Sequence, residues 1–129
     1  MYTRYYDNRY DPSAPVIEVT VYAAGATEQG QSLVALLDSG ADATLIPIEM
    51  LHKIGAEYVT TRRIRGVLGK AYKIDLYAVA LQIGTYRLDG IHAIAIERGE
   101  EEPIIGRDVL NQLVVTLNGL GEVVEIRDS

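Results

Sequence analysis

The chain contains 129 residues with a mass of 14.2 kDa, which is enough for one domain with a hydrophobic core but too little for two lobes. With 48% hydrophobic and 23% charged residues the composition is globular, and no apolar run approaches the ~20 residues of a membrane-spanning helix. The absence of cysteine excludes disulfides, thiol catalysis and thiolate metal sites, and a net charge of −6 argues against a nucleic-acid-binding surface.

The N-terminal fifteen residues are rich in Tyr, Arg and Asp, contain Pro12 and Pro15, and follow no hydrophobic period. This composition predicts a flexible arm over residues 1–15, with the folded domain spanning residues 16–129. The stretch after Met1 lacks the apolar block that a secretory signal requires, so we expect a cytoplasmic protein.

The first half of the folded part predicts two strands and a helix. Apolar and polar residues alternate over 16–23, which indicates a half-buried strand. A continuous apolar run over 33–37 is typical of a strand covered on both faces, and Asp38 comes directly after it. Residues 48–54 carry apolar side chains at helical spacing and predict a short helix that ends before Gly55.

The second half predicts further strands and a second short helix. Strands are expected at residues 58–64, 72–83, 86–96 and 104–106, a helix at 107–113, and a terminal hairpin formed by 114–117 and 123–126. The segment Gly66-Val67-Leu68-Gly69 is expected to form the tip of a hairpin between the first two of these strands. Many short strands with two minor helices and no βαβ rhythm predict an all-β fold that is closed or nearly closed.

The segment Asp38-Ser39-Gly40 is the strongest chemical signal in the chain. Gly40 allows the backbone to turn sharply and to direct its amides at the acid, which holds the carboxylate in place. An Asp in such a segment also often does no more than cap a turn, and the residues alone leave both interpretations open. Hydrolysis of an amide by water needs one carboxyl group to accept a proton and another to donate one. Because the segment occurs once, a catalytic role implies a partner.

A second segment supports the catalytic interpretation. About seventy residues after Leu37-Asp38-Ser39-Gly40-Ala41-Asp42, the chain contains Ile104-Ile105-Gly106-Arg107 followed by an expected short helix. In content, order and separation, the two segments together resemble the retropepsins, the retroviral-type aspartic proteases. The resemblance covers residues 16–118, including Gly66–Gly69, where the family has a glycine-rich flap. It implies a closed β-barrel that is active as a homodimer and hydrolyses peptide bonds in peptide or protein substrates.

The resemblance also implies roles for individual residues. Asp38 looks like the catalytic aspartate, and Asp38 of a second subunit would complete the pair. The family usually joins the residues that match Asp42 and Arg107 in an ion pair beneath the active site. The supporting loop would then comprise Ser39, Gly40, Ala41, Asp42 and Arg107. The substrate-binding flap would comprise Gly66, Val67, Leu68 and Gly69.

Two further interpretations stay open at this point. The same fold can serve as a dimerisation or peptide-binding module without turnover, since a closed flap or an unformed dimer silences an intact site. Alternatively, the arm over residues 1–15 occupies the cleft until it is removed. The segment 120–129 extends beyond the point where the viral members end, so it either rebuilds the dimer interface or caps an exposed sheet edge.

Other kinds of site are disfavoured. The basic run 62–65 is interpreted as a solvated face of a strand or turn rather than as a phosphate site. His52 and His92 have no acids at ligand spacing, so we expect no metal and no cofactor. Apolar pockets are expected from four side chains, those of Val67, Leu68, Ile104 and Ile105. Neither a nucleic acid nor a membrane is expected as a partner.

Overall fold

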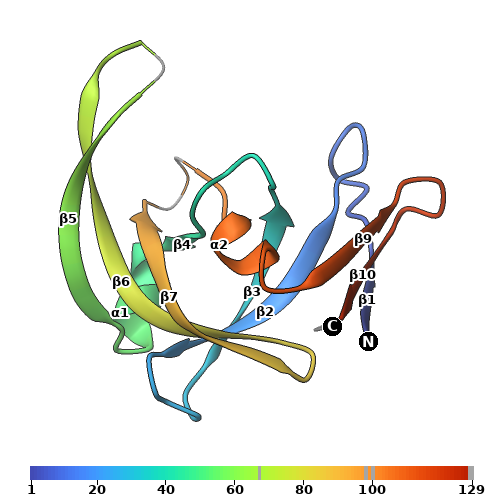
Figure 1. The fold of residues 1–129 in the computed structure, drawn as a ribbon, viewed down its shortest axis with the longest axis horizontal. Coiled ribbons are helices and arrows are strands. Elements are labelled where there is room, and N and C mark those ends of the chain that lie inside the picture. Colours follow the sequence, from blue (N-terminus) through green and yellow to red (C-terminus); the bar gives the residue numbers. More distant parts are fainter. Residues whose placement is uncertain (67, 98, 100, 128–129) are drawn as a thin grey trace.

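The computed structural model describes residues 1–66, 68–97, 99 and 101–127. In this part of the chain the regular structure consists of ten strands and two short helices (Figure 1). The strands are β1 (Tyr2–Tyr5), β2 (Val16–Ala23), β3 (Gln31–Leu37), β4 (Leu45–Pro47), β5 (Glu57–Arg65), β6 (Ala71–Ile83), β7 (Tyr86–Ile96), β8 (Ile104–Ile105), β9 (Val114–Asn118) and β10 (Val123–Arg127). The helices are α1 (Ile48–Lys53) and α2 (Arg107–Leu110).

Seven strands form one sheet in the order β2-β3-β8-β4-β7-β6-β5. Strand β2 also pairs antiparallel with β6, through residues 20–23 and 79–82, so the sheet closes on itself. The pairs β3–β8 and β4–β7 are parallel. Closure leaves β5 as the outer strand, because β5 is hydrogen-bonded to β6 alone in this sheet. The expected all-β, closed fold is confirmed.

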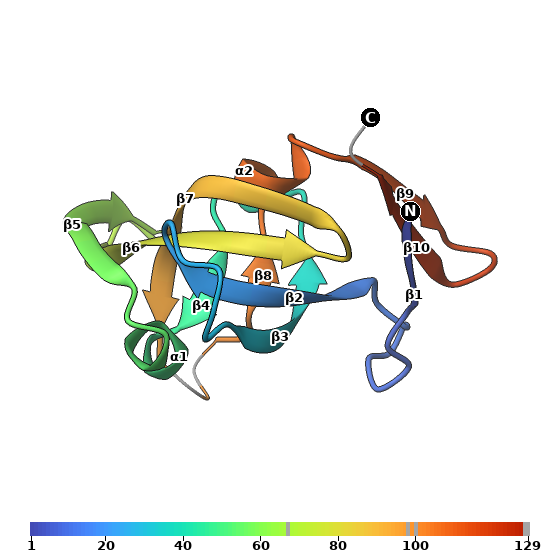
Figure 2. The same ribbon diagram turned by 90° about the horizontal axis from the view of Figure 1, so that it is seen from below.

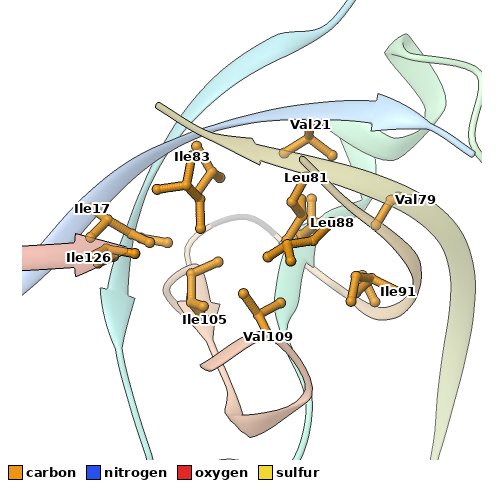
Figure 3. Packing of buried hydrophobic residues seen from close by; sticks show 14 of the residues in the cluster. Ile17, Val21, Val79, Leu81, Ile83, Leu88, Ile91, Ile105, Val109 and Ile126 are labelled. Atoms are coloured by element: carbon orange, nitrogen blue, oxygen red, sulfur yellow. The ribbon is translucent and has the colours of Figure 1, made fainter. Parts of the chain in front are cut away.

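The hydrophobic core fills the inside of this closed sheet. Apolar side chains from β2, β6, β7, β8 and α2 meet there, as Figure 3 shows for Ile17, Leu81, Leu88, Ile105 and Val109. The alternation predicted over residues 16–23 is confirmed, since every second side chain of β2 from Ile17 to Val21 is buried. Each such aliphatic side chain contributes roughly 1.5–3 kcal/mol when it leaves water.

Two expectations differ from the structure in detail. Strand β3 is not covered on both faces, because Val34 is 39% exposed while Ala35 is 1% exposed. The barrel buries only one face of the strand, and the continuous apolar run does not reveal which. Helix α2 ends at Leu110 instead of continuing to Leu113, since the amides of Gln112 and Leu113 donate to carbonyls three residues back, as in a turn. Within the described residues, neither helix is long and apolar enough to cross a membrane.

The expectation of a flexible arm is wrong for the first residues. Strand β1 pairs antiparallel with β10, and Tyr2 faces Ile126 in the register. The amide of Tyr6 donates to the carbonyl of Glu122 at 2.8 Å, and Tyr2 packs against the core. A strand of four residues carries too short a pattern to reveal a partner at the other end of the chain.

Side-chain bonds hold the rest of this N-terminal segment. The Tyr10 hydroxyl donates to Glu102 at 2.5 Å, and this hydrogen bond to a carboxylate raises the pKa of Tyr10 to about 12. Asp7 accepts hydrogen bonds from the side chain and the amide of Arg9, which lower the pKa of Asp7 to about 2. The Asp7–Arg9 bonds lie within the segment, whereas Tyr10 ties it to Glu102 and the Tyr2 hydroxyl accepts the amide of Glu18 at 2.8 Å.

The strands β1, β10 and β9 form a second, three-stranded sheet with β10 in the middle. The expected terminal hairpin of β9 and β10 is confirmed, with Val123 facing Asn118 in the register. This sheet lies at one end of the molecule and the β5–β6 hairpin lies at the opposite end, as both ribbon views show (Figures 1 and 2). The carboxyl end of β3, where Asp38 follows, lies between them (Figure 1).

Candidate active site

Asp38 stands directly after β3, where the structure joins the two segments that the sequence analysis singled out. Leu36 and Leu37 pair in parallel with Ile104 and Ile105 of β8. The amide of Asp38 continues this ladder by donating to the carbonyl of Ile105 at 3.0 Å. The backbone of the acid is therefore fixed by a strand that lies more than sixty residues away in the sequence.

The turn that follows holds the carboxylate of Asp38. The amide of Gly40 donates to Oδ1 of Asp38 at 2.9 Å, and the amide of Ala41 donates to the Asp38 carbonyl at 3.1 Å. Asp38 does cap a turn, as one of the two sequence interpretations expected. Its other carboxylate oxygen accepts no hydrogen bond from the described residues. The capping bond thus uses one oxygen of this half-buried side chain and leaves the other without a hydrogen bond from the described residues.

Gly106 allows the strand β8 and the Asp38 loop to approach closely. A Cβ atom at this position would lie 2.7 Å from the carbonyl carbon and oxygen of Ala43 and 3.0 Å from the carbonyl oxygen of Ala41. Because these are backbone atoms, no side-chain rotation relieves the clash. Only glycine fits here without moving the loop.

Two residues that the sequence analysis did not select hold the loop from below. Thr44 is 0% exposed, and its hydroxyl donates to Oδ1 of Asp108 at 2.8 Å while accepting the Gly106 amide at 3.2 Å. The Thr44 amide donates to Oδ2 of Asp108 at 3.1 Å. One signal for this pair was present in the sequence, since Thr44 is a lone polar residue between Ala43 and Leu45.

Arg107 makes the expected contact with Asp42. Nη2 of Arg107 donates to Oδ1 of Asp42, and Nη1 donates to the carbonyl of Ser39 at 2.7 Å. The pair is exposed in the single chain, because the side chain of Asp42 is 89% exposed and that of Arg107 is 42% exposed. Its position beneath the loop agrees with the expectation, but each charge keeps much of its hydration. The bond to the Ser39 carbonyl is therefore the firmer hold on the loop.

The β5–β6 hairpin ends in a tight turn, as expected. The amide of Gly66 donates to the carbonyl of Lys70 at 2.8 Å, and the amide of Gly69 donates to the carbonyl of Gly66 at 3.0 Å. Gly69 has a φ of +78°, which favours glycine at this position. Leu68 is exposed at the tip, and Val67 lies outside the described residues.

A groove of about 1020 Å³ lies between this hairpin and the body of the molecule. The Asp38 loop contributes Ala41, Asp42 and Ala43 to its wall. Most of the apolar lining comes from Leu45, Ile48, Ile64, Ile74, Leu76, Ile91, Ile94 and Ile96. Leu68, Ile104 and Ile105 do not line this groove of the single chain. The expectation of a pocket is wrong for Ile105, which is buried in the core, and stays a prediction for Leu68 and Ile104. No residue of the segment 1–15 lines the groove either, which contradicts an arm lying in the cleft.

Of the two histidines, His92 lines the groove and His52 does not. His52 lies on α1, where its ring contacts the hydroxyl of Tyr77 at 3.4 Å, and His92 lies on β7. Among the described residues, no group of three His, Asp or Glu side chains is arranged to hold a metal ion.

The closed barrel, the carboxylate after β3 and the overhanging hairpin together define the retroviral-type aspartic protease fold. A family model described as "gag-polyprotein putative aspartyl protease" matches residues 24–112, so the chain belongs to the gag-polyprotein aspartyl protease family. This confirms the retropepsin resemblance drawn from the sequence.

Solved structures of the same fold are distant in sequence. The EIAV protease in complex with the inhibitor HBY-793 is 19% identical over 76% of this chain and 86% of its own, with a TM-score of 0.55. The simian foamy virus (mac) protease, determined in solution, is 18% identical over 75% of this chain and 92% of its own, with a TM-score of 0.55. A comparison with curated protein sequences finds no match.

We expect the substitution Thr44→Val to destabilise the protein by about 1–3 kcal/mol, because it removes the donor to Asp108 and leaves the buried Gly106 amide unpaired. The free energy of unfolding in denaturant measures this effect. Thr116→Val, the same change at an exposed position of β9, is the control and is expected to change stability by less than about 0.5 kcal/mol. Equal effects of the two substitutions would contradict the role given to Thr44.

Arg107 and Asp42 are expected to differ in their contribution to stability. Asp42→Asn loses only an exposed charge pair and costs less than about 1 kcal/mol, whereas Arg107→Ala also removes the charged donor to the Ser39 carbonyl and costs about 1.5–3 kcal/mol. Denaturant unfolding of both variants at low and high salt measures the difference. An Asp42→Asn variant as unstable as Arg107→Ala would show that the ion pair is the main hold.

Proposed function

We propose that this protein is an aspartic endopeptidase that hydrolyses peptide bonds with a water molecule activated between Asp38 of two subunits. One observation carries the proposal. The turn holds one oxygen of Asp38 through the Gly40 amide, the other oxygen accepts no hydrogen bond from the described residues, and the same loop forms one wall of a groove. Membership of an aspartyl protease family supports this assignment.

The chemistry follows from two carboxyl groups that share a site. Two such groups about 3 Å apart do not both ionise, so the pair keeps one proton. The ionised carboxylate removes a proton from water as the oxygen attacks the peptide carbonyl, and the protonated partner donates its proton to the carbonyl oxygen. The tetrahedral intermediate then collapses, the amine leaves with a proton, and no covalent bond to the enzyme forms.

The requirement for a second carboxyl group makes a homodimer part of the proposal. Asp38 is the one Asp-Ser-Gly acid in the chain, so the second acid comes from a second copy related by a twofold axis. The tip of the β5–β6 hairpin, the loop after β3 and the turn between β9 and β10 all extend toward the same side of the molecule, the upper side in Figure 1. We assign the second subunit to this side.

The C-terminal hairpin supplies apolar surface for that contact. Leu117 of β9 is 54% exposed, and Leu120, in the turn between β9 and β10, is fully exposed. Strand β9 is also an edge of its sheet, with unpaired backbone groups. In this proposal the segment that extends beyond the viral members builds the dimer interface.

The β5–β6 hairpin is proposed as the flap. Its backbone overhangs the groove, and a substrate in extended conformation would add to it as a further strand, held by main-chain hydrogen bonds. The exposed Leu68 at the tip would then be covered by the substrate or by the partner's hairpin. The tight turn, with one glycine on each side, predicts a stiffer flap than one with paired glycines.

The substitution Asp38→Asn is expected to reduce peptide cleavage by about 10³-fold or more while leaving the fold intact, because an amide neither accepts nor donates the required proton. A peptide library incubated from acid to neutral pH and analysed by mass spectrometry measures the effect. Asp89→Asn, an exposed position on β7, is the matched control with unchanged cleavage. Cleavage that persists in Asp38→Asn would end the proposal, and cleavage by neither form would favour a binding module without turnover.

Leu120→Asp and Leu117→Asp are each expected to weaken the dimer at least about tenfold, because both would place a charge in an apolar contact. Sedimentation at several protein concentrations measures the dissociation constant, and activity per molecule is expected to rise with concentration in parallel. Val59→Asp, an exposed position on β5, is the control and should leave the dimer unchanged. Full activity of a strict monomer would contradict the proposed dyad.

A further inference from the structure

The charges of this chain are divided unevenly between the β5–β6 hairpin and the rest of the molecule. Five of the twelve Lys and Arg residues lie in the segment 62–73, which contains no Asp or Glu, so this part of the hairpin carries +5. With seven basic and eighteen acidic residues, the rest of the chain carries −11. A cationic hairpin therefore overhangs an acidic body.

The cations of the hairpin are exposed, and no described acid forms an ion pair with any of them. These residues are Arg62, Arg63, Arg65, Lys70 and Lys73. Arg65 donates to the carbonyl of Gly69 at 3.0 Å, and none of the five forms an ion pair with a described acid. An unpaired cation on a hairpin that covers a groove is available to a ligand in that groove.

Two of these cations, Arg62 and Lys73, line the groove itself. Three acids of the groove wall are already bound within the protein, because Asp42 pairs with Arg107, Asp75 accepts from Thr61 at 2.6 Å, and Asp108 accepts from Thr44. The acids that remain in the wall are Glu97 and Glu101, after the end of β7. The groove is thus cationic along the hairpin, apolar along its floor and acidic beyond β7.

We propose that the groove selects peptide segments that carry acidic side chains beneath the hairpin, next to apolar side chains on the floor. This inference rests on the proposed function, because it names the substrate class of the same site. Arg62 pairs with the acidic side chains, because it shares a face of the hairpin with the groove residues Ile64 and Ile74. Lys73, at the edge of the groove, and the other cations of the hairpin add an attraction that brings an acidic segment to the groove.

The rest of the molecule favours a peptide over a nucleic acid as the occupant. A polyanion that extends past the hairpin meets a body with a charge of −11. Its bases would face a mostly aliphatic floor, where Tyr72 and His92 are the aromatic side chains among the described lining residues. A short extended peptide needs only one or two acids under the hairpin and gains from the apolar floor.

The test is a binding measurement with the catalytically silent Asp38→Asn protein. Three fluorescein-labelled peptides share the same length and the same apolar pair, and carry two Glu, two Gln or two Lys residues on one side of that pair. We expect the Glu peptide to bind about fivefold to tenfold more tightly than the Gln peptide at low salt, and the Lys peptide to bind most weakly. This preference should shrink at about 0.5 M salt, where exposed charges are screened.

Substitutions in the hairpin test whether its cations cause the preference for the Glu peptide. The double variant Arg62→Gln, Lys73→Gln is expected to bind the Glu and Gln peptides within about twofold of each other, whereas the matched control Lys53→Gln, on α1 outside the groove, keeps the preference. Thermal unfolding of each variant confirms that the fold is retained. Equal binding of the three peptides, no binding of any of them, or a preference that survives the double substitution would each overturn the inference.

Two more measurements distinguish this inference from binding of a nucleic acid and from the proposed proteolysis. A single-stranded oligonucleotide that binds more tightly than the Glu peptide would overturn the choice of a peptide. The wild-type protein is then incubated with the Glu peptide. A Glu peptide that binds selectively but is never cleaved would contradict the proposed proteolysis and support the binding preference. Cleavage without any preference for the Glu peptide would support the proteolysis and contradict the binding preference.

Discussion

The parallel pairing of β3 with β8 is the interaction on which the rest of the site depends. It places Asp38 beside Ile105, so that the acid takes its backbone position from a strand far along the chain. Everything beneath the loop follows from this approach. Gly106 is required because the Ala43 carbonyl lies so close, and Thr44 and Asp108 become partners across the same contact. A short strand of two residues therefore positions chemistry that neither segment holds alone.

The loop around Asp38 is held by hydrogen bonds more than by buried charge. Asp42 and Arg107 form an ion pair in the open, where hydration takes away most of its energetic value, while the Ser39 carbonyl and the Asp108 carboxylate accept directed bonds. Such directed bonds are less sensitive to screening by salt than an exposed ion pair is. The charge of the rest of the molecule is divided between a cationic hairpin and an acidic body.

The sequence predicts those parts of the fold whose signal is local. Strand β2 has the predicted bounds, because its alternation is complete within eight residues, and α1 shows the expected buried Leu51. Strand β1 was missed because its hydrogen-bond partner is β10, at the other end of the chain. The Asp42–Arg107 contact was predicted from the resemblance to a protein family and not from a local pattern. Thr44 and Asp108 were missed because a buried polar pair has no period and becomes visible only when its two segments meet.

The β3–β8 pairing also determines when the Asp38 loop can become ordered as the ribosome synthesises the chain. Asp38 is synthesised more than sixty residues before β8, the strand that orders it, and before Gly106, Arg107 and Asp108. The second sheet forms later still, because β1 pairs with β10, which follows β8 in the sequence. Contacts of such long sequence separation form slowly, because the intervening loop must be closed first. A nascent chain therefore carries the acid before it can form the ordered loop, which requires β8 to have been synthesised.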